Sequence, residues 1–148
     1  MNLLISRIVV KLALLAGFQI AALTAHAQTA PEAGVFSLEL NSATDVTGSC
    51  RLTYVANNAT GTPLDKTSYQ MVIFDKDGGV LRFIVFEFGA FQEGKTKVVR
   101  FDIGGQTCDT ISRLLVNDID ECVSNGAPSE VCLSQVKTST RTEIAFGL

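Results

Sequence analysis

Short stretches in which apolar and polar residues alternate constrain the fold of this 148-residue chain more than any other feature. In residues 35–40 the apolar positions are Phe36, Leu38 and Leu40, and residues 50–56 show the same alternation. A period of two residues is typical of a strand that buries one face. Turn residues separate these stretches roughly every eight to twelve positions, as in small all-β domains. The pattern therefore predicts a fold made of short strands.

One pair of stretches gives the clearest local prediction. Residues 69–74 and 80–88 are rich in β-branched and aromatic side chains, and Asp75-Lys76-Asp77-Gly78-Gly79 lies between them. Asp-Gly readily adopts the positive φ angles of a tight hairpin turn. We therefore expect an antiparallel hairpin, preceded by a polar turn over residues 57–63.

The second half of the chain is less regular. Strands are expected at 96–103, with Val98 and Phe101 at its centre, and at 140–146, with a further short strand over 131–136 as an option. Residues 111–119 fit a strand or a helix, because their apolar residues also have helical spacing. A strand is favoured, since the segment is short and lies in an otherwise all-β series.

Together these segments predict an all-β chain. The expected fold is an immunoglobulin-like antiparallel β-sandwich of seven to eight strands over residues 35–148, which form a single domain after a flexible segment at 28–34.

The first 27 residues have the features of a signal peptide. Arg7 and Lys11 precede a mostly apolar run, and Ala25-His26-Ala27 ends in the small residues that a signal peptidase recognises. The run is too short for a convincing membrane span. We expect cleavage before Gln28, no membrane anchor afterwards, and a periplasmic or secreted protein.

Four cysteines lie beyond the predicted cleavage site: Cys50, Cys108, Cys122 and Cys132. An even number in an oxidising compartment indicates two disulfides. No spacing matches C-x-x-C, so a thioredoxin-type redox pair and a zinc knuckle are not suggested. We prefer Cys50–Cys108, because their strands would face each other across an immunoglobulin-like core, and Cys122–Cys132, which flank a turn-rich loop. The count alone allows three pairings.

The only histidine is His26, in the predicted leader. Without an imidazole, Ser-His-Asp and Cys-His catalysis are excluded, and zinc and copper lose their usual nitrogen ligand. The chain has 12 basic and 15 acidic residues, and two of the basic ones lie in the leader. An acidic domain does not suit nucleic acid or anionic lipid. We therefore expect no metal, no cofactor, no nucleic acid and no enzymatic activity.

Residues 57–64, Asn-Asn-Ala-Thr-Gly-Thr-Pro-Leu, precede the expected hairpin and its Asp-Gly tip. This arrangement resembles bacterial secreted immunoglobulin-like domains over about a third of the exported segment. The resemblance implies a periplasmic or extracellular β-sandwich, and it carries over no site residue. The four cysteines are not part of that signature and suggest a narrower group of small periplasmic proteins of unknown role. Asn58-Ala59-Thr60 also fits a glycosylation sequon, but the leader and the resemblance both look bacterial, which favours a plain turn.

The strand at 80–88 is apolar on both faces, which a sandwich strand with one core face does not require. Either it is covered on both sides, or Arg82, Ile84, Phe86 and Phe88 form an exposed surface for a partner. The first alternative, a core strand, is favoured; the second gives the candidate site, and a homodimer through this strand is one way to cover it.

Two polar motifs have simpler interpretations. Residues 75–79 begin like a calcium loop, but the later positions hold Gly79, Val80 and Phe86 instead of the required ligands and glycine, so a hairpin tip is favoured. Asn117, Asp118, Asp120 and Glu121 gather oxygen atoms that suit calcium or an acid–base pair, but nothing predicts their burial. A solvated strand end is favoured.

The predicted function is a non-enzymatic periplasmic binding protein, whose partner is an unknown protein or cell-envelope component. The alternative is a secreted inhibitor of a hydrolase of the protease or lysozyme type, with the loop at 123–131 entering the active-site cleft. A third hypothesis, a carboxylate-dependent hydrolase, requires a pocket that holds two acids.

Overall fold

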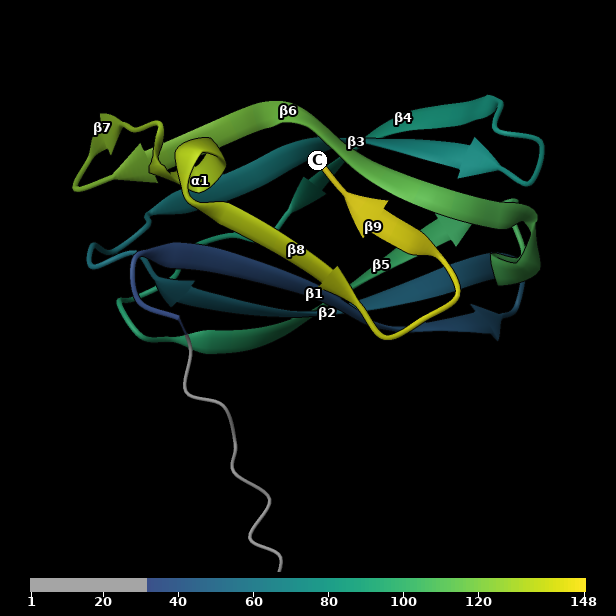
Figure 1. Cartoon of the computed structure of the whole chain (residues 1–148), viewed down its shortest axis with the longest axis horizontal. Coiled ribbons are helices and arrows are strands. Elements are labelled where there is room, and N and C mark those ends of the chain that lie inside the picture. The colour runs from purple at the N-terminus through teal and green to yellow at the C-terminus, as the bar shows by residue number, and fades with distance from the viewer. Residues whose placement is uncertain (1–31) are drawn as a thin grey trace, which may run out of the picture.

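The computed structural model describes residues 32–148 and shows two stacked β-sheets (Figure 1). The first sheet has the strand order β5-β2-β1-β8, and the second has the order β4-β3-β6-β7, with β9 also beside β6. The elements are β1 (Val35–Val46), β2 (Ser49–Ala59), β3 (Lys66–Asp75), β4 (Val80–Glu87), β5 (Thr96–Gly104), η1 (Cys108–Thr110), β6 (Ile111–Ser124), β7 (Ala127–Pro128), α1 (Val131–Ser134), β8 (Val136–Thr140) and β9 (Ala145–Gly147). The predicted β-sandwich is confirmed.

The alternating segments form the strands that the sequence predicts. β1 and β2 pair in an antiparallel register, and so do β3 and β4, which are joined by the Asp-Gly turn. Gly78 has φ +83°, and the Asp75 carboxylate accepts hydrogen bonds from the N–H groups of Asp77 and Gly79 (2.9 and 2.7 Å). The ambiguous segment 111–119 is a strand, as favoured, within the longer β6.

The core lies between the two sheets and is rich in aromatic residues. The ring of Tyr54, on β2, contacts four phenylalanine rings with centroid distances of 5.3 to 5.9 Å, those of Phe86, Phe88, Phe101 and Phe146. These rings come from both sheets, so the cluster joins the two layers. Edge-to-face pairs of this kind add to the burial of apolar area.

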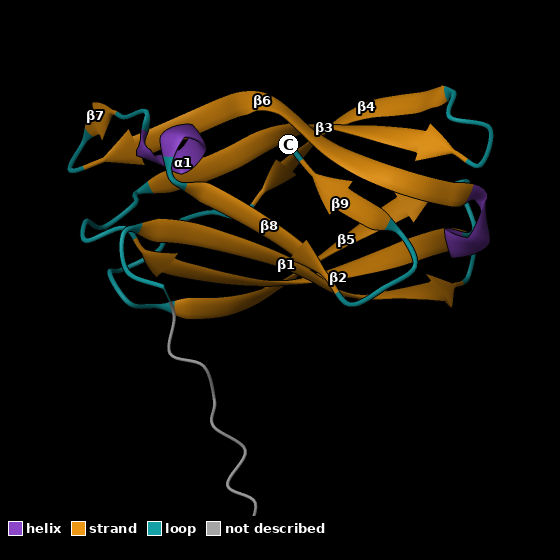
Figure 2. Ribbon diagram, viewed as in Figure 1, coloured by secondary structure: helices purple, strands orange, loops and turns teal. Residues whose placement is uncertain are grey.

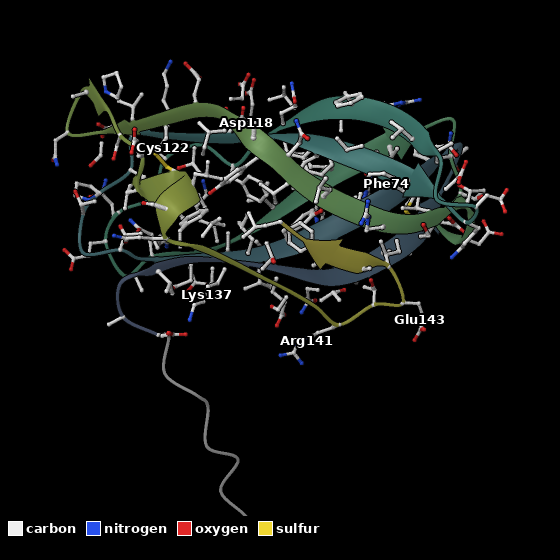
Figure 3. The ribbon with its side chains drawn as sticks, turned by 45° about the horizontal axis from the view of Figure 1, so that its top comes forward. Phe74, Asp118, Cys122, Lys137, Arg141 and Glu143 are labelled. Carbon is white, nitrogen blue, oxygen red and sulfur yellow. A yellow bond between two sulfur atoms is a disulfide. The ribbon has the colours of Figure 1, made fainter. Side chains whose placement is uncertain are left out.

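Both preferred disulfides are confirmed. Cys50 on β2 is bonded to Cys108 in η1, with Cα atoms 4.7 Å apart, and Cys122 on β6 is bonded to Cys132 in α1, with Cα atoms 6.0 Å apart. The two short helices lie at opposite ends of the sandwich (Figure 2), so each end carries one disulfide. Cys122 is labelled beside α1 in Figure 3.

The topology departs from the prediction in two ways. Nine strands are present among the described residues, against seven to eight expected, because β7 and β9 are very short. The sandwich is also not wholly antiparallel, since β8 runs parallel to β1 and β9 runs parallel to β6. The C-terminal residues therefore contribute one strand to each sheet, β8 to the first and β9 to the second.

Three local expectations are corrected. Residues 131–134 are helical and the strand begins only at Val136, because a single helical turn after Glu130 brings Cys132 to Cys122. The strand expected at 140–146 is interrupted at 141–144, where the chain passes from one sheet to the other. Val98, expected at the centre of its strand, is 61 % exposed, because it lies on the face of β5 opposite to Phe101 and Ile103, which pack against the core.

The turn predicted at 57–63 begins only after Ala59, where β2 ends. Asn58 is buried, and its amide group donates to the carbonyl oxygens of Thr62 (2.8 Å), Phe91 and Gln92 (3.3 Å each). Its own carbonyl oxygen accepts a hydrogen bond from the Thr60 hydroxyl (2.7 Å). The asparagine therefore organises the turn, and its burial is incompatible with its use as a glycosylation site.

The predicted signal peptide lies outside the described residues, as do residues 28–31 of the segment expected to be flexible. The described part of that segment makes two contacts: Gly34 N–H donates to the Ala59 carbonyl (2.7 Å), and Glu32 pairs with Lys137. Within residues 32–148, no helix is long and apolar enough to cross a membrane.

Candidate functional site

The structure assigns β4 a core face and a solvent face, and the predicted partner residues fall mostly on the core face. Phe86 is fully buried and Phe88 is 2 % exposed. Ile84 is half-buried against the core, and Arg82 is exposed. The alternative in which these four residues form an exposed surface is therefore wrong for Phe86 and Phe88, which are core residues as the favoured alternative predicts.

The pairing of β3 with β4 explains this burial. Phe86 lies opposite Tyr69 and Ile84 lies opposite Met71, and residues that face each other across an antiparallel pair share a side of the sheet. Tyr69 and Met71 are fully buried between the sheets. Phe86 also stacks on Phe101 of β5, with ring centroids 4.1 Å apart. This stack closes the sandwich between its two edge strands, so Phe86 is not available to a partner.

The exposed apolar side chains of β4 are on neighbouring positions that the sequence reasoning did not select. Val80, Leu81, Phe83 and Val85 are 54, 37, 60 and 41 % exposed. They are four of the seven exposed large apolar residues in the described part of the chain, and they lie within six consecutive positions. We call these four residues the β4 apolar patch. Clustering of this kind marks interaction surfaces, whereas single exposed apolar residues are ordinary.

On the outer face of the second sheet, the residues that follow Phe83 across the neighbouring strands are also apolar, although Val72 is only 3 % exposed and Leu115 is half-buried. Phe83 lies opposite Val72 on β3, which lies opposite Leu115 on β6, so these three residues form an apolar row across the outer face. The next row, Val85, Gln70 and Asp118, is mixed, and the row after that, Glu87, Ser68 and Glu121, is polar. The outer face is therefore apolar near the β3–β4 hairpin and polar at the other end.

β4 is also an edge strand, because β3 is its only strand neighbour among residues 32–148. Edge strands commonly carry charged side chains that discourage pairing with another chain. β5, the edge strand of the other sheet, carries Lys97, Arg100 and Asp102. β4 carries only Arg82 and Glu87, near its two ends. The edge of β4 is thus weakly protected where its outward side chains are apolar.

The acidic residues of β6 do not converge on one point. Asn117 donates to Gln70 Oε1 (2.7 Å), Asp120 accepts from the Ser68 hydroxyl (2.8 Å), and Glu121 pairs with Lys66 (3.0 Å). Asp118 is exposed and accepts the backbone N–H of Ile119 (2.8 Å); Figure 3 labels it on β6. Each side chain has a different local partner, which supports the interpretation as a solvated strand end.

A shallow hollow of about 230 Å³ lies over β3 and contains two carboxylates, those of Glu87 and Glu121, on either side of Ser68. Carboxylate catalysis needs one acid that is removed from water, so that it stays protonated. Both side chains are exposed here, and the Lys66 ammonium group binds Glu121. The hollow therefore lacks the environment of a general acid.

One group of possible metal ligands brings Asp45, Cys50 and Cys108 within 4.8 Å of one another. The two sulfur atoms are joined in a disulfide, and the Asp45 carboxylate accepts the N–H of Cys108 (2.6 Å). A disulfide sulfur is not a thiolate ligand. This group is therefore structural.

The pKa shifts of two acidic residues follow from ion pairs on the surface of the first sheet. Hydrogen bonds from Arg51 lower the pKa of Asp102, and hydrogen bonds from Arg141 and Asn41 lower the pKa of Glu39. The Arg51–Asp102 pair joins β2 to β5, and the Arg141–Glu39 pair joins the residue after β8 to β1, so both pairs lie on the first sheet. They are part of the sheet surface and do not form a reactive site.

The loop at 123–131 is exposed and well anchored. Cys122 and Cys132 bind its two ends together, Gly126 N–H donates to the Asp65 carboxylate (2.7 Å), and Ser129 N–H donates to the Cys122 carbonyl (3.0 Å). Residues 125–128 are exposed at its tip, where Figure 1 shows the β6–β7 hairpin at one end of the molecule. The loop thus projects into solvent and is braced at its base by the disulfide and the hydrogen bonds.

Comparison with known protein families, with curated proteins and with solved structures finds no match for this chain.

Proposed function

We propose that the protein is a non-enzymatic interaction protein of the periplasm or of the secreted space, and that it binds a protein partner through the β4 apolar patch. The observation that carries the proposal is the concentration of four exposed apolar side chains on one edge strand. Aromatic residues, phenylalanine included, are enriched at the buried centre of interfaces, and Phe83 presents an aromatic ring that is 60 % exposed.

Two further features support an exported binding protein. The leader-like first 27 residues and the two disulfides both suit an oxidising compartment outside the cytoplasm. Residues 28–148 also contain no histidine, and both acids in the hollow over β3 are exposed to water. The chemistry of the chain thus supports recognition more than catalysis.

Substitution within the patch tests the proposal. Val85→Lys places a charge in the patch without disturbing the core, because the side chain is 41 % exposed. Leu133→Lys is the matched control, since Leu133 is also 41 % exposed but lies on α1. We expect affinity capture from envelope extracts, followed by mass spectrometry, to recover a protein with the native chain and with Leu133→Lys but not with Val85→Lys. Identical captured proteins in all three samples would exclude the patch as the binding surface.

A second candidate function, inhibition of a hydrolase, is favoured by the braced loop at 123–131. A loop held by a disulfide and by backbone hydrogen bonds loses little conformational entropy when it enters a cleft. Inhibition assays against proteases and lysozymes test this function. The expected result is inhibition that is lost when Ala127 and Pro128 are replaced by glycine and retained with Val85→Lys. An absence of inhibition across both enzyme classes would exclude it.

A further inference from the structure

We propose that the partner of the β4 apolar patch is a second copy of this chain, whose β4 pairs edge to edge and antiparallel with the first. This inference rests on the proposed function, because it names the partner of the same surface. The result is a two-fold symmetric dimer in which the second sheet of each copy continues into that of the other.

The free edge of β4 provides the backbone groups for this pairing. An edge strand presents N–H and C=O groups that have no neighbour in the ladder, and a second strand can satisfy them. The register shift between β3 and β4 lies between Ile73 and Phe74, at the hairpin end. The segment from Arg82 to Glu87 is paired without interruption and is long enough to serve as a template.

The other strand edges are less suited to self-pairing. β5 carries three charged side chains, and β7 and β9 have only two and three residues. β8 has five residues and carries Lys137, which is exposed and paired with Glu32. Among the described strands, β4 combines a long free edge with exposed apolar side chains.

The pattern of charges on β4 selects an antiparallel arrangement. Arg82 stands near the start of the strand and Glu87 at its end, and both are exposed. Parallel pairing in register would bring Arg82 next to Arg82 and Glu87 next to Glu87 of the second copy, whereas antiparallel pairing keeps like charges at opposite ends of the interface. The two residues lie on opposite faces of β4, so they do not form an ion pair across the interface, but the antiparallel direction is the one that avoids like charges.

The apolar side chains select the register. A two-fold axis through Ile84 places Phe83 opposite Val85 of the second copy, and Val85 opposite its Phe83, all on the outer face. An axis one residue further, through Val85, places Phe83 opposite Glu87 instead. An axis through Phe83 would place Leu81 opposite Val85, but Leu81 lies at the register shift, outside the segment that pairs regularly with β3. Because directly opposed apolar side chains stabilise a sheet, the register centred on Ile84 is preferred. Residues on the same side of both copies then form one continuous apolar stripe.

Sedimentation velocity of the exported, disulfide-bonded protein over a range of concentrations tests the inference. We expect a concentration-dependent dimer. Val85→Lys and Phe83→Glu each introduce two like charges, which lie diagonally across the symmetric interface, and we expect each to raise the dimer dissociation constant by about tenfold or more. The double variant Phe83→Glu/Val85→Lys places opposite charges directly across from each other twice, so we expect it to recover much of the lost association.

Amide hydrogen exchange gives an independent readout. The β4 amides that point away from β3 should exchange more slowly at concentrations where the dimer forms, and they should lose this protection in Val85→Lys. Leu133→Lys should dimerise like the native chain. Circular dichroism and the mass of the disulfide-bonded form show whether each variant folds.

A native chain that is monomeric at all concentrations overturns the inference, and so does a dimer that persists unchanged in both single variants. A double variant that fails to recover association excludes the register centred on Ile84. If the native chain is monomeric but Val85→Lys still abolishes capture of another protein, self-pairing is wrong while the proposed function stands. If neither dimer nor capture depends on the patch, both are wrong.

Discussion

At the scale of single residues, the two tyrosines show how hydrogen bonding determines the effect of a buried hydroxyl group. Tyr54 and Tyr69 are both fully buried. The Tyr69 hydroxyl donates to the Cys132 carbonyl (2.7 Å), whereas the Tyr54 hydroxyl has no hydrogen-bond partner among the described residues. A buried hydroxyl without a partner costs about 1–3 kcal/mol, and a satisfied one contributes about 1 kcal/mol. The same side chain therefore has opposite effects at the two positions.

This difference predicts opposite results for one substitution. Tyr54→Phe removes an unsatisfied hydroxyl, and we expect it to raise the free energy of unfolding by about 1 kcal/mol. Tyr69→Phe leaves the Cys132 carbonyl without its donor, and we expect a decrease of about 1–2 kcal/mol. Urea unfolding followed by circular dichroism measures both values. Changes of the same sign in the two variants would contradict this account.

At the scale of elements, the disulfides connect parts of the chain that lie at different separations in sequence. Cys50–Cys108 joins β2 of the first sheet to η1, which leads directly into β6 of the second, over 58 residues. Cys122–Cys132 joins β6 to α1 over only 10 residues. Since the entropy lost by the unfolded chain grows with loop length, the longer bridge should stabilise the fold more.

Loss of each bridge has a predictable cost. We expect Cys50→Ala/Cys108→Ala to lower the free energy of unfolding by about 4 kcal/mol, and Cys122→Ala/Cys132→Ala by about 3 kcal/mol. Since small domains are stable by only about 5–15 kcal/mol, the first variant should unfold at a much lower denaturant concentration. Guanidinium unfolding of both variants tests this order. An unchanged midpoint without Cys50–Cys108 would contradict it.

At the scale of the whole molecule, both tyrosines belong to one aromatic core, so we expect their hydroxyl groups to ionise only when the protein unfolds. Burial raises the pKa of Tyr54 and of Tyr69, the only two tyrosines in the chain. In the unfolded chain their pKa is about 10. Above that pH the unfolded chain binds fewer protons than the folded one, so stability decreases as the pH rises, by about 1.4 kcal/mol per pH unit for each tyrosine. Below it, the tyrosines have no effect on the pH dependence.

The prediction is an alkaline unfolding transition. We expect tyrosinate absorbance to appear together with the loss of the β-sheet circular dichroism signal, because neither ring can ionise inside the closed sandwich. In Tyr54→Phe only one ring remains, so the tyrosine contribution to the slope of stability against pH should be halved. Tyrosinate absorbance near pH 10 in protein that remains folded would show that the rings are accessible.

The alternation of apolar and polar residues by itself was enough to predict the sandwich and most strand positions. A strand with one apolar and one polar face turns its apolar face to the core, whatever its neighbours are. The places of the cysteines relative to the expected strands and turns suggested both disulfides, but only the approach of β2 to η1 and of β6 to α1 decided their pairing. The crossing at 141–144 likewise needed the tertiary structure, since Ile144 and Phe146 reach the core from a segment that leaves one sheet for the other.

The candidate site depended even more on tertiary structure. Residues 80–88 are apolar on both faces, so the local pattern identified the strand and its surplus of apolar side chains but contained no information on which face is buried. The pairing with β3 and the stack of Phe86 on Phe101 made that choice, which left Phe83 and Val85 in solvent in place of Phe86 and Phe88. When both faces of a strand can fill a core, only the neighbouring strands determine which one does.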